Sequence, residues 1–186
     1  MGFRVAVVLL PFVLSAAVVP TGALSSSAGR LPTRTIDLAS GQLGGHTVLG
    51  RTVAGVTAAV GRPDQRLRGI ARYTLRYEPT SSRLGNWGVQ ILFRRDRGVL
   101  RSWSIVLTDS TFREPKTGRL LRLTPSALEK AVIAGYGDRY AVVRPYRCTT
   151  KPAQCRGELG PRGAGRFRLG IGLLMQSRQT YLVLYT

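Results

Sequence analysis

The sequence has few of the side chains that bind metals. In 186 residues it contains one histidine, His46, and two cysteines, Cys148 and Cys155. A conventional structural zinc site takes about four cysteine or histidine ligands, which these three residues do not supply. We therefore expect neither a metal site nor a cofactor.

The chain also lacks the motifs of the common catalytic machineries. Its nine acidic residues are scattered, and none forms the close carboxylate pair that glycosidases use. The nucleophile-elbow, Ser-x-x-Lys, phosphate-loop and zinc-protease motifs do not occur. His46 lies in a Leu-Gly-Gly-His-Thr stretch that is typical of a solvent-exposed loop. We expect no catalytic residue; a small extracellular enzyme that uses His46 is the alternative.

Lysine and asparagine are scarce. Only Lys116, Lys130 and Lys151 are lysines, and Asn86 is the sole asparagine. Arginine therefore carries almost all of the formal net charge of +19. Such a charge favours anionic partners such as acidic proteins, envelope polymers, lipids or nucleic acids. A G+C-rich coding sequence produces the same arginine-rich usage, so the charge also has a purely compositional explanation.

Long apolar runs are confined to the N-terminus. Arg4 precedes an apolar run over residues 5–19, and residues 21–23 are small, as signal peptidase requires. The run is shorter than the ~20 residues of a membrane-spanning helix. We predict a signal peptide over residues 1–23 and a secreted, extracytoplasmic protein, with an uncleaved N-terminal anchor as the alternative. No cysteine stands directly after this run, where a lipoprotein would carry its lipid-modified cysteine, which argues against a lipoprotein.

The two cysteines lie close together in the sequence. Export would place Cys148 and Cys155 in an oxidising environment, where disulfides persist. We therefore expect them to pair. The chain-entropy model gives about 2 to 2.5 kcal/mol for so short a loop, which makes the bond a local clip.

Helix start and stop signals occur twice. Residues 24–45 are rich in serine, glycine and proline and predict a flexible leader, with one short strand possible at residues 35–38. Thr52 and Thr124 then suit helix N-caps, with apolar residues four and eight positions later. Gly61 and the Gly-Tyr-Gly of residues 135–137 are expected to end these helices.

Apolar residues alternate with polar ones after each expected helix. This pattern predicts antiparallel strands. A tight turn is expected at Asp96-Arg97-Gly98, between the second and third strands of the first half. The strands are predicted at residues 73–77, 87–93 and 103–107 in the first half, and around residues 140–143, 167–173 and 181–185 in the second.

Together these signals predict an α+β fold of two tandem repeats. Each repeat is expected to be a helix followed by a three-stranded antiparallel meander, with both helices packed on one face of the sheet. The repeats would span about residues 46–110 and 117–186, within a single domain at residues 46–186.

A set of glycine, threonine and apolar residues accompanies this order of elements. The set comprises Gly50, Arg51, Thr52, Val56, Gly61 and Pro63 before the first meander, and Thr117, Gly118, Thr124, Leu128, Tyr136 and Gly137 before the second. The pattern resembles the tandem-repeat fold of the beta-lactamase inhibitory proteins and of the outer-membrane assembly lipoproteins of the SmpA/OmlA type. The resemblance implies that architecture and a habit of acting by binding. Two features depart from it: the lipoprotein cysteine is missing, and the second glycine stop falls later after its threonine.

Strand alternation sorts the arginines by face. Tyr73, Tyr77, Phe93 and Phe167 fall on the inward face, so the aromatic residues are not expected to form a base-stacking platform, and nucleic acid is a weaker candidate partner. Arg101 shares the parity of Trp103 and fits neither face. The arginines expected on the open face, and hence the candidate binding residues, are Arg72, Arg76, Arg94, Arg166 and Arg168.

These observations predict a secreted, non-catalytic protein that binds an anionic protein surface or a cell-envelope polymer. An inhibitor of an extracellular hydrolase is a narrower version, implied by the resemblance. A structural or adhesive envelope protein without a specific partner is the alternative.

Overall fold

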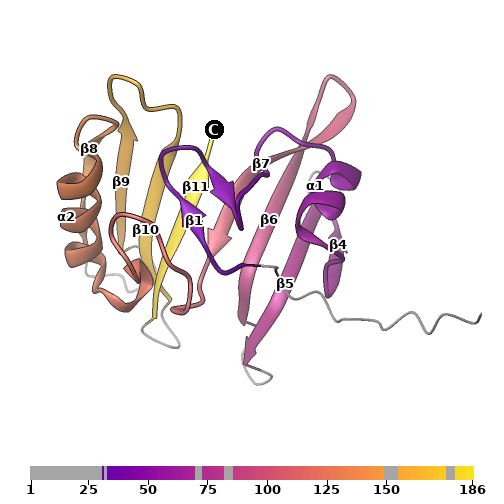
Figure 1. Ribbon diagram of the computed structural model, residues 1–186, viewed down its shortest axis with the longest axis horizontal. Coiled ribbons are helices and arrows are strands. Elements are labelled where there is room, and N and C mark those ends of the chain that lie inside the picture. The colour runs from indigo at the N-terminus through magenta and orange to yellow at the C-terminus, as the bar shows by residue number, and fades with distance from the viewer. Residues whose placement is uncertain (1–30, 32, 70–72, 82–85, 149–154, 175–178) are drawn as a thin grey trace, which may run out of the picture.

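The computed structural model describes residues 31, 33–69, 73–81, 86–148, 155–174 and 179–186. Its main feature is one antiparallel sheet of eight strands in the order β4-β5-β6-β7-β11-β10-β9-β8. Strands β4 to β7 form one meander and β8 to β11 a second, and the two meet where β7 pairs with β11 (Figure 1). A small sheet has the order β1-β2-β3.

The elements have the following bounds. The small sheet comprises β1 (Ile36–Asp37), β2 (Gln42–Leu43) and β3 (His46–Thr47). The large sheet comprises β4 (Gln65–Arg68), β5 (Tyr73–Ser81), β6 (Asn86–Asp96), β7 (Val99–Leu107), β8 (Tyr140–Arg147), β9 (Arg156–Pro161), β10 (Arg168–Leu174) and β11 (Gln179–Tyr185). The helices are α1 (Val53–Val60), α2 (Pro125–Tyr136) and the single 3-10 turn η1 (Leu120–Arg122).

Both α-helices begin at the expected threonines. The Thr52 hydroxyl accepts a hydrogen bond from the Gly55 N–H at 3.2 Å, and the Thr124 hydroxyl accepts one from the Ala127 N–H at 3.4 Å. A side-chain oxygen at this position satisfies an N–H group that the helix itself leaves unpaired. Gly61, with φ of 92°, follows α1 at its C-terminal end. The predicted helix starts are confirmed.

One face of the large sheet is apolar from β5 to β9. Cross-strand partners project to the same side of a sheet, so the register identifies the residues that share a face. The helix residues Val56, Val60, Leu128, Val132 and Tyr136 are buried in the same cluster, so the helices cover this face. The row of buried partners on this face is Leu75, Ile91, Ile105, Leu184, Leu169 and Leu159. We call the opposite side the open face.

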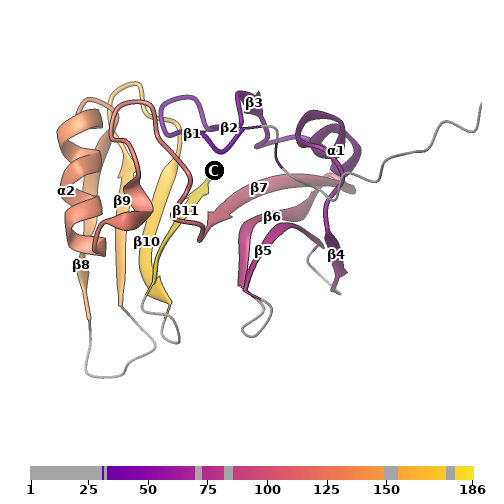
Figure 2. The same cartoon turned by 60° about the horizontal axis from the view of Figure 1, so that its bottom comes forward.

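Residue 31 and residues 33–48 close the core between the two helices (Figure 2). The Tyr140 hydroxyl donates a hydrogen bond of 2.6 Å to the Leu38 carbonyl and ties this segment to β8. The described part of the expected flexible leader is therefore packed. Its few apolar residues meet the sheet only once the chain has folded, so the sequence pattern did not predict their burial. Its buried side chains include Leu31, Ile36, Leu38 and Leu43, and Val48 is buried just after it.

The expected fold class is wrong. The prediction was an α+β fold of two helix-plus-three-strand repeats, whereas the described residues form a mostly β structure dominated by a single eight-stranded sheet. Four strands, not three, follow each helix. The pairing of β7 with β11 joins all of them into one hydrogen-bonded layer.

The two unpredicted strands, β4 and β9, have little strand character of their own. Every residue of β4 is exposed, so no buried side alternates with an exposed one. The β9 sequence contains Gly157 and Gly160, and glycine weakens strands. Both segments are strands because their backbones pair with neighbours: β4 with β5, and β9 with both β8 and β10.

A buried carboxylate fixes the connection to α2. Glu114 is 2% exposed and accepts hydrogen bonds from the backbone of Lys116 and Thr117, from the Thr117 hydroxyl and from the Tyr136 hydroxyl. Burial, followed by this contact with Glu114, raises the pKa of Tyr136. The loop before α2 is therefore bonded to the helix end, and α2 is held at both of its ends.

Candidate binding face

A row of open-face residues runs across all eight strands. At its β5 position the Arg76 guanidinium donates to Gln65 Oε1 at 3.0 Å and to Gln90 Oε1 at 3.3 Å, so this arginine is held by its neighbours within the row. In sheet order the row reads Gln65, Arg76, Gln90, Val106, Val183, Gly170, Glu158 and Arg144.

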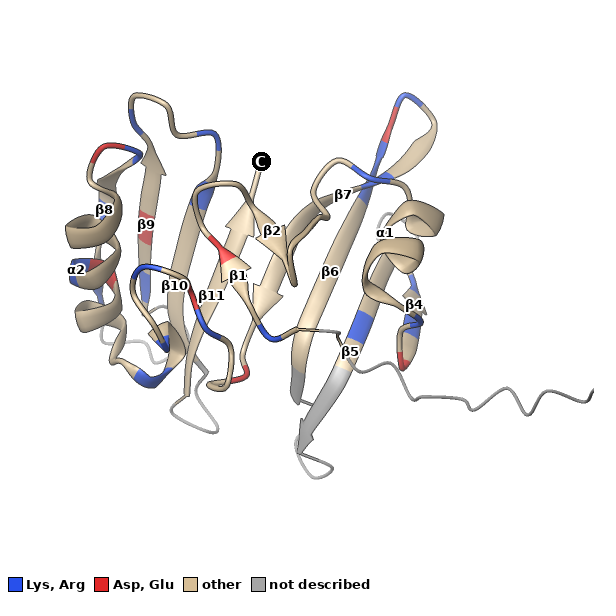
Figure 3. Cartoon of the chain, in the orientation of Figure 1, with Lys and Arg blue, Asp and Glu red and all other residues tan. Residues whose placement is uncertain are grey.

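Three of the five candidate arginines lie in described strands. Arg76, Arg94 and Arg168 occupy positions next to the buried Leu75, Phe93 and Leu169, which places them on the open face. Basic residues lie in both halves of the large sheet and in its connections (Figure 3).

The other two candidates are not part of this group. Arg166 is exposed just before β10 and lines a hollow with Ser40 and Arg139, beside the small sheet. Arg72 lies outside the described residues.

A bulge in β7 adds an aromatic side chain to the open face. Leu92 pairs with Ser104 but Phe93 pairs with Ser102, so Trp103 is the extra residue. The Trp103 ring contacts Tyr185 edge to face with centroids 6.3 Å apart. The Arg94 guanidinium lies 5.6 Å from the Trp103 ring centroid, within cation–π range.

This bulge corrects one prediction and explains another. Alternation placed Trp103 inward with Ile105 and Leu107; the latter two are buried, but Trp103 is half-buried among open-face residues. The shift in register also explains why the parity of Arg101 matched neither face. Tyr73, Tyr77 and Phe93 are buried as predicted, and Phe167 is half-buried.

Glu158 is the acidic member of the row. Its Oε1 accepts hydrogen bonds from the Arg168 guanidinium at 2.8 Å and from the Tyr185 hydroxyl at 3.0 Å. The bond from Arg168 holds the pKa of Glu158 below its usual value, and the charge of the nearby Arg144 acts in the same direction. Burial raises the pKa of Tyr185, and the bond to Glu158 adds to this effect. Arginine side chains thus already hold a carboxylate on this face.

Two more arginines border a groove next to Glu158. The groove has a volume of about 290 Å³ and lies between Arg144 and Arg156 on one side and Tyr181 and Tyr185 on the other. Both arginines are exposed, and within the described part of the chain neither guanidinium makes a hydrogen bond or an ion pair. Their charge is therefore available to a ligand.

Gly170 leaves the floor of this groove without a side chain. Gly170 and Gly172 of β10 sit between the strands that carry the arginines and the tyrosines. A Cβ atom on Gly172 would lie 2.3 Å from the Tyr181 ring, so that ring occupies the space above Gly172. A Cβ on Gly170 would lie 3.5 Å from the nearest atom, an ordinary contact distance. The open part of the groove is therefore above Gly170.

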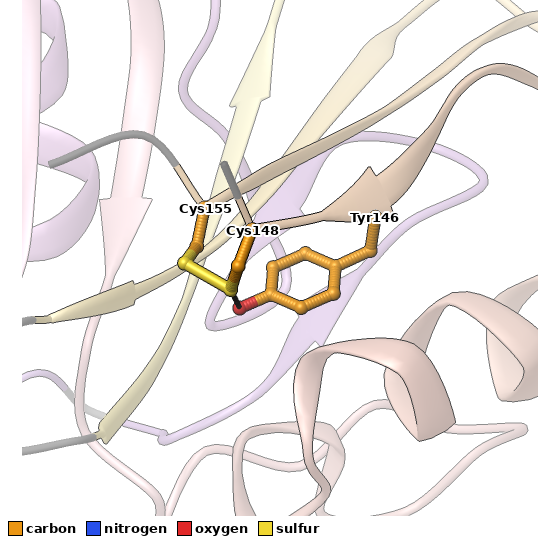
Figure 4. The surroundings of a disulfide bond; sticks show 3 residues. All are labelled: Tyr146, Cys148 and Cys155. Carbon is orange, nitrogen blue, oxygen red and sulfur yellow. Dashed lines mark hydrogen bonds between the residues drawn. A yellow bond between two sulfur atoms is a disulfide. The ribbon is translucent and has the colours of Figure 1, made fainter. Parts of the chain in front are cut away.

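The disulfide lies at the end of the hairpin that carries the arginines. Cys148 and Cys155 are bonded, as predicted, and they join the end of β8 to the start of β9. The Tyr146 hydroxyl lies 3.5 Å from Cys148 Sγ (Figure 4). The bond limits the separation of the two strands on which Arg144, Arg156 and Glu158 stand.

Sequence reasoning missed Arg144, Arg156 and Glu158 because it did not predict β9 or the full length of β8. An Arg-Gly-Glu segment directly after a cysteine was the available signal.

The structure also places His46 and the residue types that bind metals. His46 is exposed in β3. Among the residues that the structure describes, no group of three or more His, Cys, Asp and Glu side chains could hold a metal ion. Within the same residues, no helix has the length and apolar character needed to cross a membrane.

No protein-family model, curated protein or solved structure matches this chain. The resemblance to the beta-lactamase inhibitory and SmpA/OmlA-type proteins therefore stays a prediction.

Proposed function

We propose that this chain is a secreted, non-catalytic binding protein that engages an anionic macromolecule through its open face. The observation that carries the proposal is the pair Arg144 and Arg156, which border a groove and whose guanidinium groups make no hydrogen bond or ion pair with the described residues. Guanidinium groups bind carboxylate and phosphate oxygens in a bidentate manner, and they are less strongly hydrated than an ammonium group.

The neighbouring contacts support an anionic ligand. Glu158 is held by Arg168 and Tyr185, and this internal contact supports the binding of a ligand carboxylate by arginines on the same face. On the same face, the Trp103 and Tyr185 rings offer apolar area between charged groups. Buried aromatic and arginine side chains are the residues that most often dominate binding energy.

The test compares two variants of equal charge. In the first, five open-face arginines become glutamine: Arg76, Arg94, Arg144, Arg156 and Arg168. In the second, five exposed arginines outside the described open face become glutamine: Arg51, Arg62, Arg113, Arg122 and Arg162.

Binding to immobilised poly-L-glutamate, a polyuronate and a single-stranded oligonucleotide is measured at several salt concentrations. We expect the open-face variant to bind at least one of these polymers at least tenfold more weakly than the matched control, which corresponds to about 1.4 kcal/mol. Equal losses in the two variants would contradict the proposal.

Equal losses would favour the second candidate, an adhesive envelope protein whose net charge of +19 acts without a defined site. Its binding would weaken steeply and uniformly with salt, because exposed charges are screened within about 8 Å at physiological ionic strength.

A further inference from the structure

The groove above Gly170 combines three kinds of binding group. Arg144 and Arg156 supply cationic donors, Glu158 supplies a carboxylate acceptor, and Tyr181 and Tyr185 supply rings. The rings stand on β11 and the charged groups on β8 and β9, with β10 between them. The walls on β9 and β11 are therefore two strand spacings apart, roughly 10 Å.

The groove offers little to an extended peptide. A peptide usually gains affinity from backbone hydrogen bonds along a free strand edge. Strand β10 pairs with β9 on one side and with β11 on the other, so the backbone of the floor is already used. A ligand in this groove has to be recognised by side chains.

The charges of the groove disfavour a ligand that carries only anionic groups. The Glu158 carboxylate lines the same groove as the two arginines, and it would repel closely spaced phosphates or sulfates. It is, however, a good acceptor for hydroxyl groups. The best match is a ligand that carries carboxylate and hydroxyl groups on one ring.

The size of the groove agrees with a single ring. Its 290 Å³ is at the small end of ligand pockets, which span about 300–1,000 Å³. A sugar ring placed above Gly170 would have a tyrosine wall on one side and the arginines on the other.

We infer that this groove binds the carboxylated sugar unit of an acidic polysaccharide, with Arg144 and Arg156 on the carboxylate and Glu158 on ring hydroxyls. This inference rests on the proposed function and names the class of polymer. An acidic protein and a nucleic acid are then alternative outcomes of the test.

The experiment is calorimetric titration of the purified protein with a tetramannuronate. The reference ligands are a neutral mannotetraose, poly-L-glutamate and a single-stranded oligonucleotide. The wild-type protein is expected to bind the uronate and not the neutral sugar. If it binds both equally, the carboxylate has no role and the inference fails.

Two variants separate the site from the net charge. Arg144→Gln with Arg156→Gln removes the cationic wall, whereas Gly170→Leu fills the groove and leaves the charge unchanged. Both are expected to weaken uronate binding at least tenfold, while the control Arg62→Gln with Arg122→Gln stays within about twofold of wild type. If Gly170→Leu does not fold, as judged by circular dichroism, Tyr181→Ala takes its place and should weaken binding at least threefold.

Uronate binding that is unchanged in the groove-filling variant would overturn the inference. If poly-L-glutamate or the oligonucleotide binds more tightly than the uronate, and the open-face variant loses that binding, the inference fails but the proposed function stands. If none of the anionic ligands binds, both fail.

Discussion

The two halves of the large sheet share an order of elements but use their open-face arginines differently. In the first half Arg76 is bonded to two glutamines and Arg94 lies over Trp103. In the second half, within the described residues, Arg144 and Arg156 have no such contacts. Both described open-face arginines of the first half are thus held by neighbouring side chains, whereas in the second half Arg168 is held by Glu158 and Arg144 and Arg156 are available for binding.

Counting outward from the β7–β11 junction shows where the difference arises. The row begins with Val106 in one half and Val183 in the other, and the next positions are Gln90 and Gly170. The Gln90 side chain accepts a bond from Arg76, whereas Gly170 has no side chain to fill the space or to bind an arginine. The groove therefore results from the missing side chain at Gly170 more than from the basic character of the surface around it.

The largest expected difference between the halves concerns their helices. Helix α2 lies against β8, β9 and β10, whereas α1 lies against β7 and β3. Leu128 in α2 is fully buried, so Leu128→Ala should lower the free energy of unfolding by about 2–5 kcal/mol. Val56→Ala in α1 removes less buried volume and should cost about 1.5–2.5 kcal/mol.

Urea denaturation of both variants checks this difference, with the exposed Lys130→Ala as control. A larger loss for Val56→Ala would show that the first helix, not the second, holds the sheet.

The disulfide provides the next contrast, because it clips the β8–β9 hairpin, whereas no disulfide bonds β4 to β5. Cys148→Ser with Cys155→Ser should lower the free energy of unfolding by about 2 to 2.5 kcal/mol. Amide hydrogen exchange should speed up most in β8 and β9 and least in β4 and β5. Acceleration of equal size in both hairpins would mean that the bond stabilises the whole fold and not the groove.

The smallest expected effect is a difference in pH dependence. Arg168 is bonded to Glu158, which titrates, whereas Arg76 is bonded to glutamines, which do not. Because folding lowers the pKa of Glu158 from its ordinary value of 4.5, its ionised form stabilises the fold above that pH. This contribution is lost as the pH falls through the lower, folded-state pKa.

Thermal unfolding between about pH 6 and pH 2 measures this loss. Glu158→Gln should make the acid decline shallower, and Arg76→Gln should leave its shape unchanged. Asp37 remains as a second contributor in both variants, because hydrogen bonds from Ser40 and Ala39 outweigh its burial and lower its pKa. An unaltered acid decline in Glu158→Gln would show that the bond from Arg168 does not affect folding.

Local signals in the sequence predicted the elements whose stabilising contacts join residues close together in the chain. The threonine caps marked both helix starts, because an N-cap hydroxyl bonds within its own first turn. The turn between β6 and β7 has Arg97 with φ of 48° and Gly98 with φ of 83°, and the glycine at its second position made it predictable. The cysteine pair was predictable because the short separation in sequence favours pairing, as would the predicted export.

The candidate site was predicted only in part. Arg76, Arg94 and Arg168 could be placed by alternation, because they stand on strands with a buried side. Arg144, Arg156 and Glu158 could not, since they depend on β9, a strand that exists through its pairing with β8 and β10. The position of Trp103 depended on a one-residue bulge, which is a property of two strands together.

The sequence by itself therefore determined the net charge, the two helices, the strands with an apolar side and the disulfide. These follow from side chains and from contacts between close neighbours in the chain. Only the tertiary structure decided that β7 pairs with β11, that residues 33–48 complete the core, and that Gly170 lies between arginines and tyrosines. Each of these depends on segments far apart in the chain, whose register is set by burying one common apolar face.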